Sequence, residues 1–375
     1  MGSELLLLIV IATALAFDFT NGFHDTANAM ATSIATRALP PRVAVGLSAV
    51  LNIAGAFLSL KVATTISKGI VNSSEITLAV LLAALVGALF WNLITWYFSL
   101  PSSSTHALIG GIIGAAWVAK GSKAVQGSGV LGKVVVPAVV SPVIAGLVAV
   151  LGTFIAYRLV QRMARNAARD GDSGEERARR GYRFGQIGSA SLVSLAHGTN
   201  DAQKTMGVIT LALVVHGSIG KHAGVPTWVI ITAACSIGAG TYIGGWRIIR
   251  TLGHRLTQIE SPQGFAAESS AASVLLASSY FGYPLSTTHI VSGAVVGSGA
   301  GRRLAEVRWN LAGQIVAAWV VTLPAAALAG GLVYEAVRHL GAAGAGPIVV
   351  AAAAVIAAAL LFALAQRNPV TMNDV

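Results

Sequence analysis

The chain has 375 residues, of which 55% are hydrophobic and only 10% are charged, and its mean hydropathy is +0.73. About a quarter of the residues of a soluble domain are charged, so this composition excludes an ordinary soluble protein and indicates a membrane protein. The single cysteine, Cys235, excludes an internal disulfide and a cysteine metal cluster.

Apolar segments long enough to cross a membrane follow one another along the whole chain. A helix of about 20 residues spans the hydrocarbon layer, and the segments predict an all-α polytopic membrane protein with its N-terminus outside. The expected helices lie at 4–36 (interrupted), 42–61, 76–99, 101–119 and 129–158, then at 187–217 (interrupted), 225–246, 265–283, 284–300, 309–337 and 346–365.

A basic polar segment, residues 159–186, separates the two halves of the chain. Because Lys and Arg concentrate on the cytoplasmic side of membrane proteins, we expect a cytoplasmic loop here. With this orientation 17 of the 25 Lys and Arg residues lie at cytoplasmic ends. Orientation and attraction to anionic membrane lipids explain the net charge of +11, which therefore does not indicate nucleic-acid binding. The predicted units are a first repeat (1–158), the basic loop (159–186), a second repeat (187–338) and a further C-terminal transmembrane helix with its tail (339–375).

Two polar segments of the first half return in the second half. Asn21–Met30 corresponds to His197–Met206, and Pro101–His106 corresponds to Pro284–His289. An odd number of predicted crossings separates the copies, so they face opposite sides of the membrane. We therefore expect an inverted-topology repeat with broken helices and helical hairpins, an architecture that places the binding site of a transporter near the bilayer midplane.

The first pair of segments places charged and amide side chains at the depth of the bilayer centre. Asp25 and Asn28 share a helix face, and Asp201 and Lys204 repeat this spacing. A charge there costs at least ~2.5–3.5 kcal/mol on the insertion scale, so the cluster implies a cavity or ion partners. The glycine before each cluster would permit unwinding that frees carbonyls for a cation. The alternative is a buried hydrogen-bond network that only holds helices together.

The second pair of segments has the composition of an anion-binding helix start. Proline suits the first turn of a helix, and the hydroxyls and free N–H groups behind it lie at the positive end of the helix dipole. This combination suits a tetrahedral oxyanion, although N-capping alone would explain one such segment. The candidate anion ligands are Ser103, Ser104, Thr105, Ser286, Thr287 and Thr288, followed by His106 and His289, each of which could be a proton site, a ligand or a capping donor.

These four segments, with Gly264–Glu268, resemble the signatures of the PiT-type inorganic phosphate transporters over nearly the whole chain. The resemblance implies a transporter, and not an enzyme, of the bacterial cytoplasmic membrane. It would be an inverted-repeat homodimer that carries inorganic phosphate by alternating access, driven by protons or sodium. By this resemblance Asn28 and Asn200 join the hydroxyl residues at the phosphate, and Asn21, His24, Asp25, Asp201 and Glu268 belong to the coupling ion, with Lys204 as a further intramembrane residue.

The first signature differs from that of the sodium-coupled members, which read Gly-Ala-Asn-Asp where residues 22–25 read Gly-Phe-His-Asp. The His-Asp form is similar to bacterial low-affinity transporters that carry phosphate as a neutral metal complex with a proton. Imidazole titrates near neutral pH, so His24 indicates a proton as the coupling ion, with sodium as the alternative. Mg²⁺ or another divalent metal would then accompany phosphate as cargo, and no cofactor is expected.

Other functions fit part of the same pattern. Sulfate is also tetrahedral and would suit the hydroxyl groups, but a carboxylate only accepts hydrogen bonds and so favours a protonated ligand such as hydrogen phosphate. An anion channel would need one continuous polar pore rather than two opposed anion sites. The sequence contains no Gly-x-x-x-x-Gly-Lys-Ser/Thr motif, which disfavours an ATP-driven pump.

Overall fold

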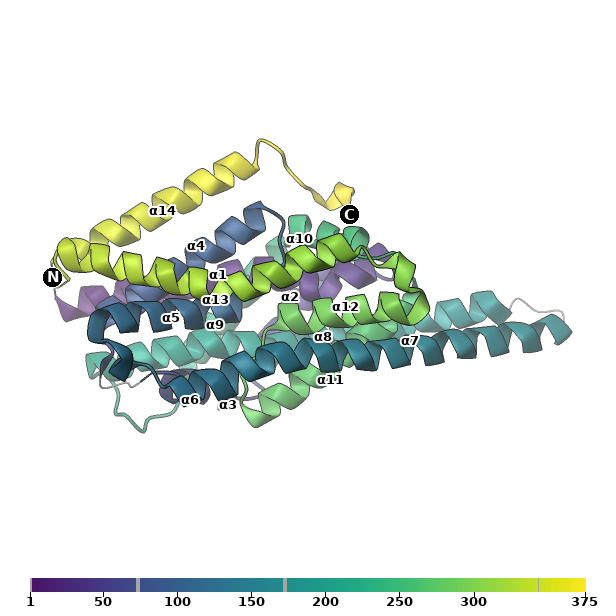
Figure 1. Cartoon of the computed structure of the whole chain (residues 1–375), viewed down its shortest axis with the longest axis horizontal. Coiled ribbons are helices and arrows are strands. Elements are labelled where there is room, and N and C mark those ends of the chain that lie inside the picture. Colours follow the sequence, from purple (N-terminus) through teal and green to yellow (C-terminus); the bar gives the residue numbers. More distant parts are fainter. Residues whose placement is uncertain (1, 72–74, 171–173, 343) are drawn as a thin grey trace.

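The computed structural model describes residues 2–71, 75–170, 174–342 and 344–375, and these residues form an all-helical protein. Most of the helices lie side by side, roughly along one direction (Figure 1). Short 3₁₀ and π-helical turns connect them, and Val71 and Val125 form an isolated β-bridge. The prediction of an all-α fold is confirmed. The helices are α1 (Ser3–Ala35), α2 (Pro41–Gly55), α3 (Lys61–Lys68), α4 (Leu78–Tyr97), α5 (Ser104–Lys120), α6 (Gly127–Val130), α7 (Val136–Asp170), α8 (Gly174–His216), α9 (Thr227–Ile243), α10 (Trp246–Arg250), α11 (Ser261–Phe281), α12 (Thr287–Arg302), α13 (Trp309–His339) and α14 (Gly346–Ala365).

Several of these helices are suited to a membrane. Among the described residues, α1, α4, α13, α14 and the α6–α7 stretch are long and apolar enough to cross one, and α9 with α10 adds a sixth span if this bent pair counts as one. Large apolar side chains lie exposed along α7, α13 and α14. A surface this apolar is stable in lipid and not in water, so the chain is a multi-pass membrane protein.

The two helices that the sequence predicted to be broken are continuous, so that prediction was wrong. α1 and α8 pass through Gly22 and Gly198 without interruption. A Cβ atom on Gly22 would lie 2.3 Å from the carbonyl oxygen of Ile237 in α9, and one on Gly198 would lie 2.1 Å from that of Asn52 in α2. These glycines therefore allow helices to touch and do not unwind them. A break of 58° lies instead between α9 and α10, where Gly244 has a positive φ of 79°.

Each serine-rich segment begins the second helix of a hairpin, as expected. The chain leaves α4 through Ser99 and leaves α11 through Gly282, both in the left-handed conformation with φ of 58° and 77°. In both turns the next residue donates its N–H to a helix carbonyl five positions back, which is the bonding of a Schellman helix end. The chain then returns as α5 and α12, whose first turns lie in the protein interior.

Matched glycines hold the second helix of each hairpin against a long helix. A Cβ atom on Gly114 in α5 would lie 1.8 Å from the carbonyl oxygen of Ala327 in α13, and one on Gly297 in α12 would lie 2.2 Å from that of Gly146 in α7. Because no side chain fits at these contacts, the backbones touch. The contacts fix the positions of the two helix starts that carry the serine and threonine residues.

The basic segment 159–186 is largely helical and not a loop, which corrects the prediction. α7 continues to Asp170, and α8 begins at Gly174. The two helices extend beyond the rest of the bundle (Figure 1). The segment contains seven arginines and four alanines, residue types that favour helix even where no core covers them. Its cytoplasmic location stays a prediction.

Candidate functional site

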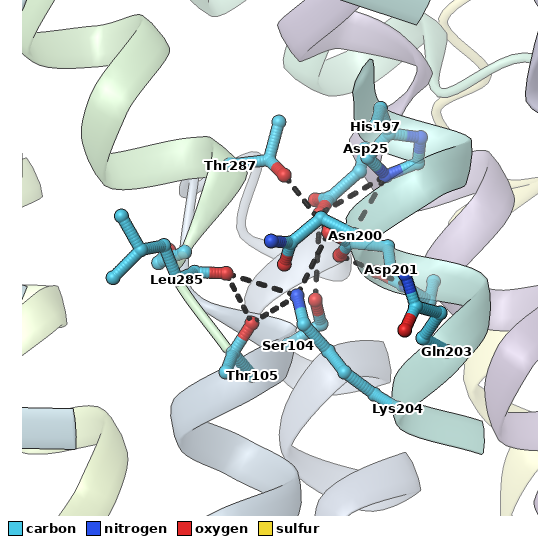
Figure 2. A network of polar contacts seen from close by, with 12 residues as sticks. Asp25, Ser104, Thr105, His197, Asn200, Asp201, Gln203, Lys204, Leu285 and Thr287 are labelled. Carbon is cyan, nitrogen blue, oxygen red and sulfur yellow. Dashed lines mark hydrogen bonds and ion pairs between the residues drawn. The ribbon is translucent and has the colours of Figure 1, made fainter. Parts of the chain in front are cut away.

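Four helices bring their polar residues together in the interior of the bundle. α1 packs against α8, and the first turns of α5 and α12 contribute side chains to the same region (Figure 2). The predicted site residues are all 5% exposed or less, so this conformation is closed to both sides. They are Asn21, His24, Asp25, Asn28, Ser103, Ser104, Thr105, His106, Asn200, Asp201, Lys204, Glu268, Ser286, Thr287, Thr288 and His289.

Two of the predicted anion ligands serve as helix caps. The Oγ atom of Ser103 accepts a hydrogen bond from the N–H of His106 at 3.1 Å, and Ser286 accepts one from His289 at 3.3 Å. An N-cap serine satisfies one of the free N–H groups of the first turn. The residues that follow each cap make the contacts with the carboxylates at the centre of the site.

The carboxylate of Asp25 joins α1 to the starts of both α5 and α12. Its Oδ1 atom lies 2.8 Å from Nδ1 of His24 and accepts a hydrogen bond from the hydroxyl of Thr288 at 3.2 Å. Its Oδ2 atom accepts one from Ser104 at 3.3 Å. Residues predicted from separate motifs thus meet at a single buried carboxylate.

Asp201 makes the corresponding contacts from α8. Its Oδ1 atom forms an ion pair of 2.8 Å with Nζ of Lys204 and accepts a hydrogen bond of 2.9 Å from Thr287 (Figure 2). Its Oδ2 atom accepts one from Nδ2 of Asn21 at 3.3 Å. In the sequence repeat Thr287 corresponds to Ser104, so each carboxylate is bonded to the same hydroxyl position of its own half.

Asn28 and Lys204 bond to the threonines of the opposite half. Asn28 donates from Nδ2 to Oγ1 of Thr288 at 2.9 Å, and Lys204 donates from Nζ to Oγ1 of Thr105 at 2.5 Å. Lys204 also donates to the carbonyl oxygen of Leu285 at 3.0 Å. The side chains on α1 and α8 therefore bind the start of the second helix of the hairpin in the other half.

His197 lies between the two carboxylates, a role that the sequence argument missed. Its Nε2 atom is 3.7 Å from Oδ2 of both Asp25 and Asp201. Its Nδ1 atom is 3.0 Å from Oδ1 of Asn52, whose Nδ2 donates to Thr241. This network assigns the proton to Nδ1, so the lone pair of Nε2 in the neutral ring faces the carboxylates. The available signal was that His197 corresponds to Asn21 in the repeat.

Asp25, His197 and Asp201 offer ligand atoms that lie within 4.8 Å of one another. Two carboxylate oxygens and an imidazole nitrogen at this spacing suit a small cation. Two further acceptors, Oδ1 of Asn21 and Oδ1 of Asn28, are buried without a hydrogen-bond partner. The centre therefore has more acceptors than donors, which favours a bound cation.

Asn200 contacts the α11–α12 hairpin rather than the carboxylates. Its Nδ2 atom donates to the hydroxyls of Ser278 and Ser279 and to the carbonyl oxygen of Tyr283, at 3.3, 3.1 and 3.2 Å. It therefore supports the turn that precedes the second serine-rich segment.

Glu268 is buried in a second polar cluster. One carboxylate oxygen accepts hydrogen bonds from Thr32 and Ser33 of α1 at 2.5 and 2.7 Å and from Gln186 of α8 at 3.3 Å. The other accepts one from Ser189 at 2.6 Å. All four donors are neutral and none belongs to the central cluster, so the structure places this predicted coupling residue apart from Asp25.

His106 and His289 meet behind the two helix starts. Their ring centroids are 4.7 Å apart in an edge-to-face arrangement, and His289 also stacks on Trp319 at 4.2 Å. Nδ1 of His289 lies 3.3 Å from the carbonyl oxygen of Ala138. These rings link the two hairpins and have no bond to the carboxylates.

The chain resembles known phosphate transporters over most of its length. Residues 21–330 match the model of the phosphate transporter family. The probable low-affinity inorganic phosphate transporter of Mycobacterium bovis is 59% identical over 337 residues, which cover 90% of this chain and 78% of the relative. A relative of the same description from Rhizobium meliloti is 46% identical over 332 residues, covering 88% of this chain and 96% of the relative. A solved structure described as the sodium-dependent phosphate transporter has a TM-score of 0.79 and 25% identity, and the match covers 90% of this chain and all of that one. The chain therefore belongs to the phosphate transporter family, and it is a transporter and not an enzyme.

Proposed function

We propose that this protein is a secondary active transporter that carries inorganic phosphate together with a cation across the bacterial cytoplasmic membrane. The observation that carries the proposal is the direct bonding of Asp25 and Asp201 to the hydroxyls that begin α5 and α12. An anion bound by these hydroxyls would lie beside two carboxylates. Because like charges repel strongly in a buried site, phosphate can bind there only when cations bind with it.

The charges of the central cluster also indicate that phosphate binds together with a cation. Asp25 and Asp201 carry two negative charges and Lys204 carries one positive charge, so with neutral imidazoles the cluster is already negative before an anion enters. A phosphate of either physiological charge state increases this excess. Each ligand therefore raises the affinity for the other, which is the thermodynamic basis of coupled transport.

The phosphate would be held by the hydroxyls of Ser104, Thr105, Thr287 and Thr288. In the closed conformation these hydroxyls donate to carboxylates and to a backbone carbonyl. Rotation of each O–H toward an oxyanion would turn the same four donors to the substrate, at the positive ends of two helices. Family membership favours phosphate over the sulfate alternative.

For the coupling cation we propose the site between Asp25, His197 and Asp201, with a proton as the transported ion. His24 supports the choice of a proton, since its Nδ1 atom is 2.8 Å from Asp25 and imidazole exchanges protons near neutral pH. A sodium ion would use the same carboxylates with the free amide oxygens of the cluster. The transport assays below separate these two ions.

Alternating access is the proposed mechanism, since the closed centre must open for phosphate to enter or leave. The pairs Asp25–Ser104 and Asp201–Thr287 occupy corresponding positions in the two halves. This correspondence supports the inverted repeat of 1–158 and 187–338, whose halves would open the site to opposite sides in turn. The homodimer stays a prediction.

Uptake of labelled phosphate into proteoliposomes tests the proposal. Wild-type protein should accumulate phosphate when a cation gradient is imposed, and excess sulfate should not compete. Asp25→Asn and Asp201→Asn should each abolish accumulation, whereas Asp374→Asn in the exposed tail should not. Uptake that ignores every cation gradient would indicate a channel, and equal competition by sulfate would overturn the substrate.

A further inference from the structure

We propose that the ammonium group of Lys204 is a tethered cation. It occupies, in the second half of the site, a position that would otherwise bind a second transported cation, so that no second ion moves with phosphate. The inference rests on the proposed cation coupling and adds the number of cations that accompany each phosphate.

The surroundings of Lys204 are those of a metal cation. Its Nζ atom has three oxygen partners, which are Oδ1 of Asp201 at 2.8 Å, Oγ1 of Thr105 at 2.5 Å and the carbonyl oxygen of Leu285 at 3.0 Å (Figure 2). An ammonium group has three donors, so its bonding capacity is complete. Carboxylate, hydroxyl and carbonyl oxygens are also the ligands of hard metal cations. The side chain is 1% exposed, so it is shielded from bulk solvent.

The first half carries an amide where the second half carries this ammonium. Lys204 falls on Asn28 when Asn21–Met30 is aligned with His197–Met206, and each side chain donates to a matched threonine, Thr105 or Thr288. The Oδ1 atom of Asn28 has no hydrogen-bond partner. An amide oxygen can bind a cation, whereas an ammonium group has no acceptor and excludes one.

The two carboxylates therefore have different counter-ions. The basic nitrogen nearest to Asp25 is Nδ1 of His24, and the one nearest to Asp201 is Nζ of Lys204, each at 2.8 Å. An imidazole exchanges its proton near neutral pH, but a lysine in an ion pair keeps its charge. The charge that neutralises Asp201 belongs to the chain and stays behind when phosphate leaves.

The test compares the charge moved per phosphate in proteoliposomes, measured from reversal potentials, in the wild type and in Lys204→Asn. The wild-type measurement comes first, because a wild type without any coupling would overturn the proposed function and not this inference. Lys204→Asn should lose uptake at low sodium and regain it at high sodium, with one additional positive charge moved per phosphate. Sodium should also raise the thermal stability of this variant and leave that of the wild type unchanged.

Two further variants keep the test decisive. Lys204→Ala should be inactive alone and should regain uptake with methylammonium, which replaces the missing ammonium group. Asn28→Lys should move one positive charge fewer per phosphate than the wild type, because it tethers a cation in the first half as well. A Lys204→Asn protein that keeps the wild-type charge ratio while binding phosphate more weakly would show that Lys204 is only a phosphate ligand. Variants that fold but respond neither to sodium nor to methylammonium would also overturn the inference.

Discussion

Oδ1 of Asn52 lies 3.0 Å from Nδ1 of His197, so a residue of α2 sets the orientation of an imidazole in the centre of the site. Asn52 donates from Nδ2 to Thr241 at 2.8 Å, and Thr241 in turn donates to the carbonyl oxygen of Ile237. This series of hydrogen bonds leaves Oδ1 of Asn52 free to accept a hydrogen bond from the N–H at Nδ1 of His197. Such a bond behind a ligating histidine fixes its tautomer and strengthens its other nitrogen as a ligand.

Asn52→Ala should therefore weaken cation binding without touching the phosphate ligands. Loss of a partner of this kind costs roughly 10–100-fold in ion affinity, so the cation concentration for half-maximal uptake should rise by about that factor. Phosphate affinity at saturating cation should stay unchanged. Ser48→Ala is the matched control, since Ser48 lies on the same helix and bonds Ser194 away from the centre. An unchanged cation dependence would show that His197 needs no such support.

Thr105→Ala and Thr288→Ala should each weaken phosphate binding. Both hydroxyls face the central cluster from helix starts, and a hydrogen bond to a charged group contributes about 1.5–3 kcal/mol. Affinity measured by calorimetry should fall roughly tenfold or more. The serine variants at the same positions keep the hydroxyl and should keep most of the affinity. Full binding by both alanine variants would exclude the helix starts as the phosphate site.

Gly114→Ala should prevent correct folding, because the added Cβ atom would lie 1.8 Å from the carbonyl oxygen of Ala327. The helices α5 and α13 would have to separate, and the start of α5 would lose its position. Gly313→Ala is the control, since nothing lies within 4 Å of a Cβ atom there and alanine favours helix by about 1 kcal/mol. Thermal unfolding in detergent distinguishes the two, and equal stability would mean that this helix contact is not close.

The repeat made much of the site predictable, since corresponding polar residues of two halves indicate a shared centre. Asp25, Ser104 and Thr288 were identified this way, and the structure brings them together. Asn52 could not be placed from the sequence, because it lies outside the two pairs of matching polar segments and reaches the centre only through His197.

The glycines before the two charged clusters were misread for a physical reason. A glycine in a helix permits unwinding or close packing, and the sequence alone does not show what lies opposite. Gly22 faces the backbone of α9, and Gly198 faces that of α2. The basic segment 159–186 was misread because its polarity resembles that of a loop, while its seven arginines and four alanines favour helix.

Glu268→Gln tests whether the second buried carboxylate takes part in coupling. Its four neutral donors provide no compensating charge, so a proton or cation would accompany it during transport. In the variant, net uptake should lose its response to the cation gradient, while phosphate exchange at equal ion concentrations continues. Ser189→Ala, which keeps the carboxylate and loses one hydrogen bond, is the control. Normal gradient-driven uptake by Glu268→Gln would assign the cluster to helix packing alone.

The driving ion is tested by His24→Asn. The imidazole of His24 joins Asp25 at 2.8 Å and lies 3.4 Å from the hydroxyl of Thr95, and asparagine can replace its hydrogen bond but cannot exchange a proton. Wild-type uptake should rise with an inwardly directed proton gradient and ignore sodium, whereas the variant should respond weakly to the proton gradient.

This experiment must distinguish an effect of pH on the protein from an effect on the substrate, because external pH also changes the fraction of phosphate that is monoanionic. External pH is therefore held fixed and only internal pH is varied, with and without magnesium, since a metal complex of phosphate would change the charge that enters with it. Under these conditions a proton gradient acts on the protein alone. Sodium-stimulated uptake with no response to internal pH would show that sodium is the coupling ion and that His24 serves only to bind Asp25.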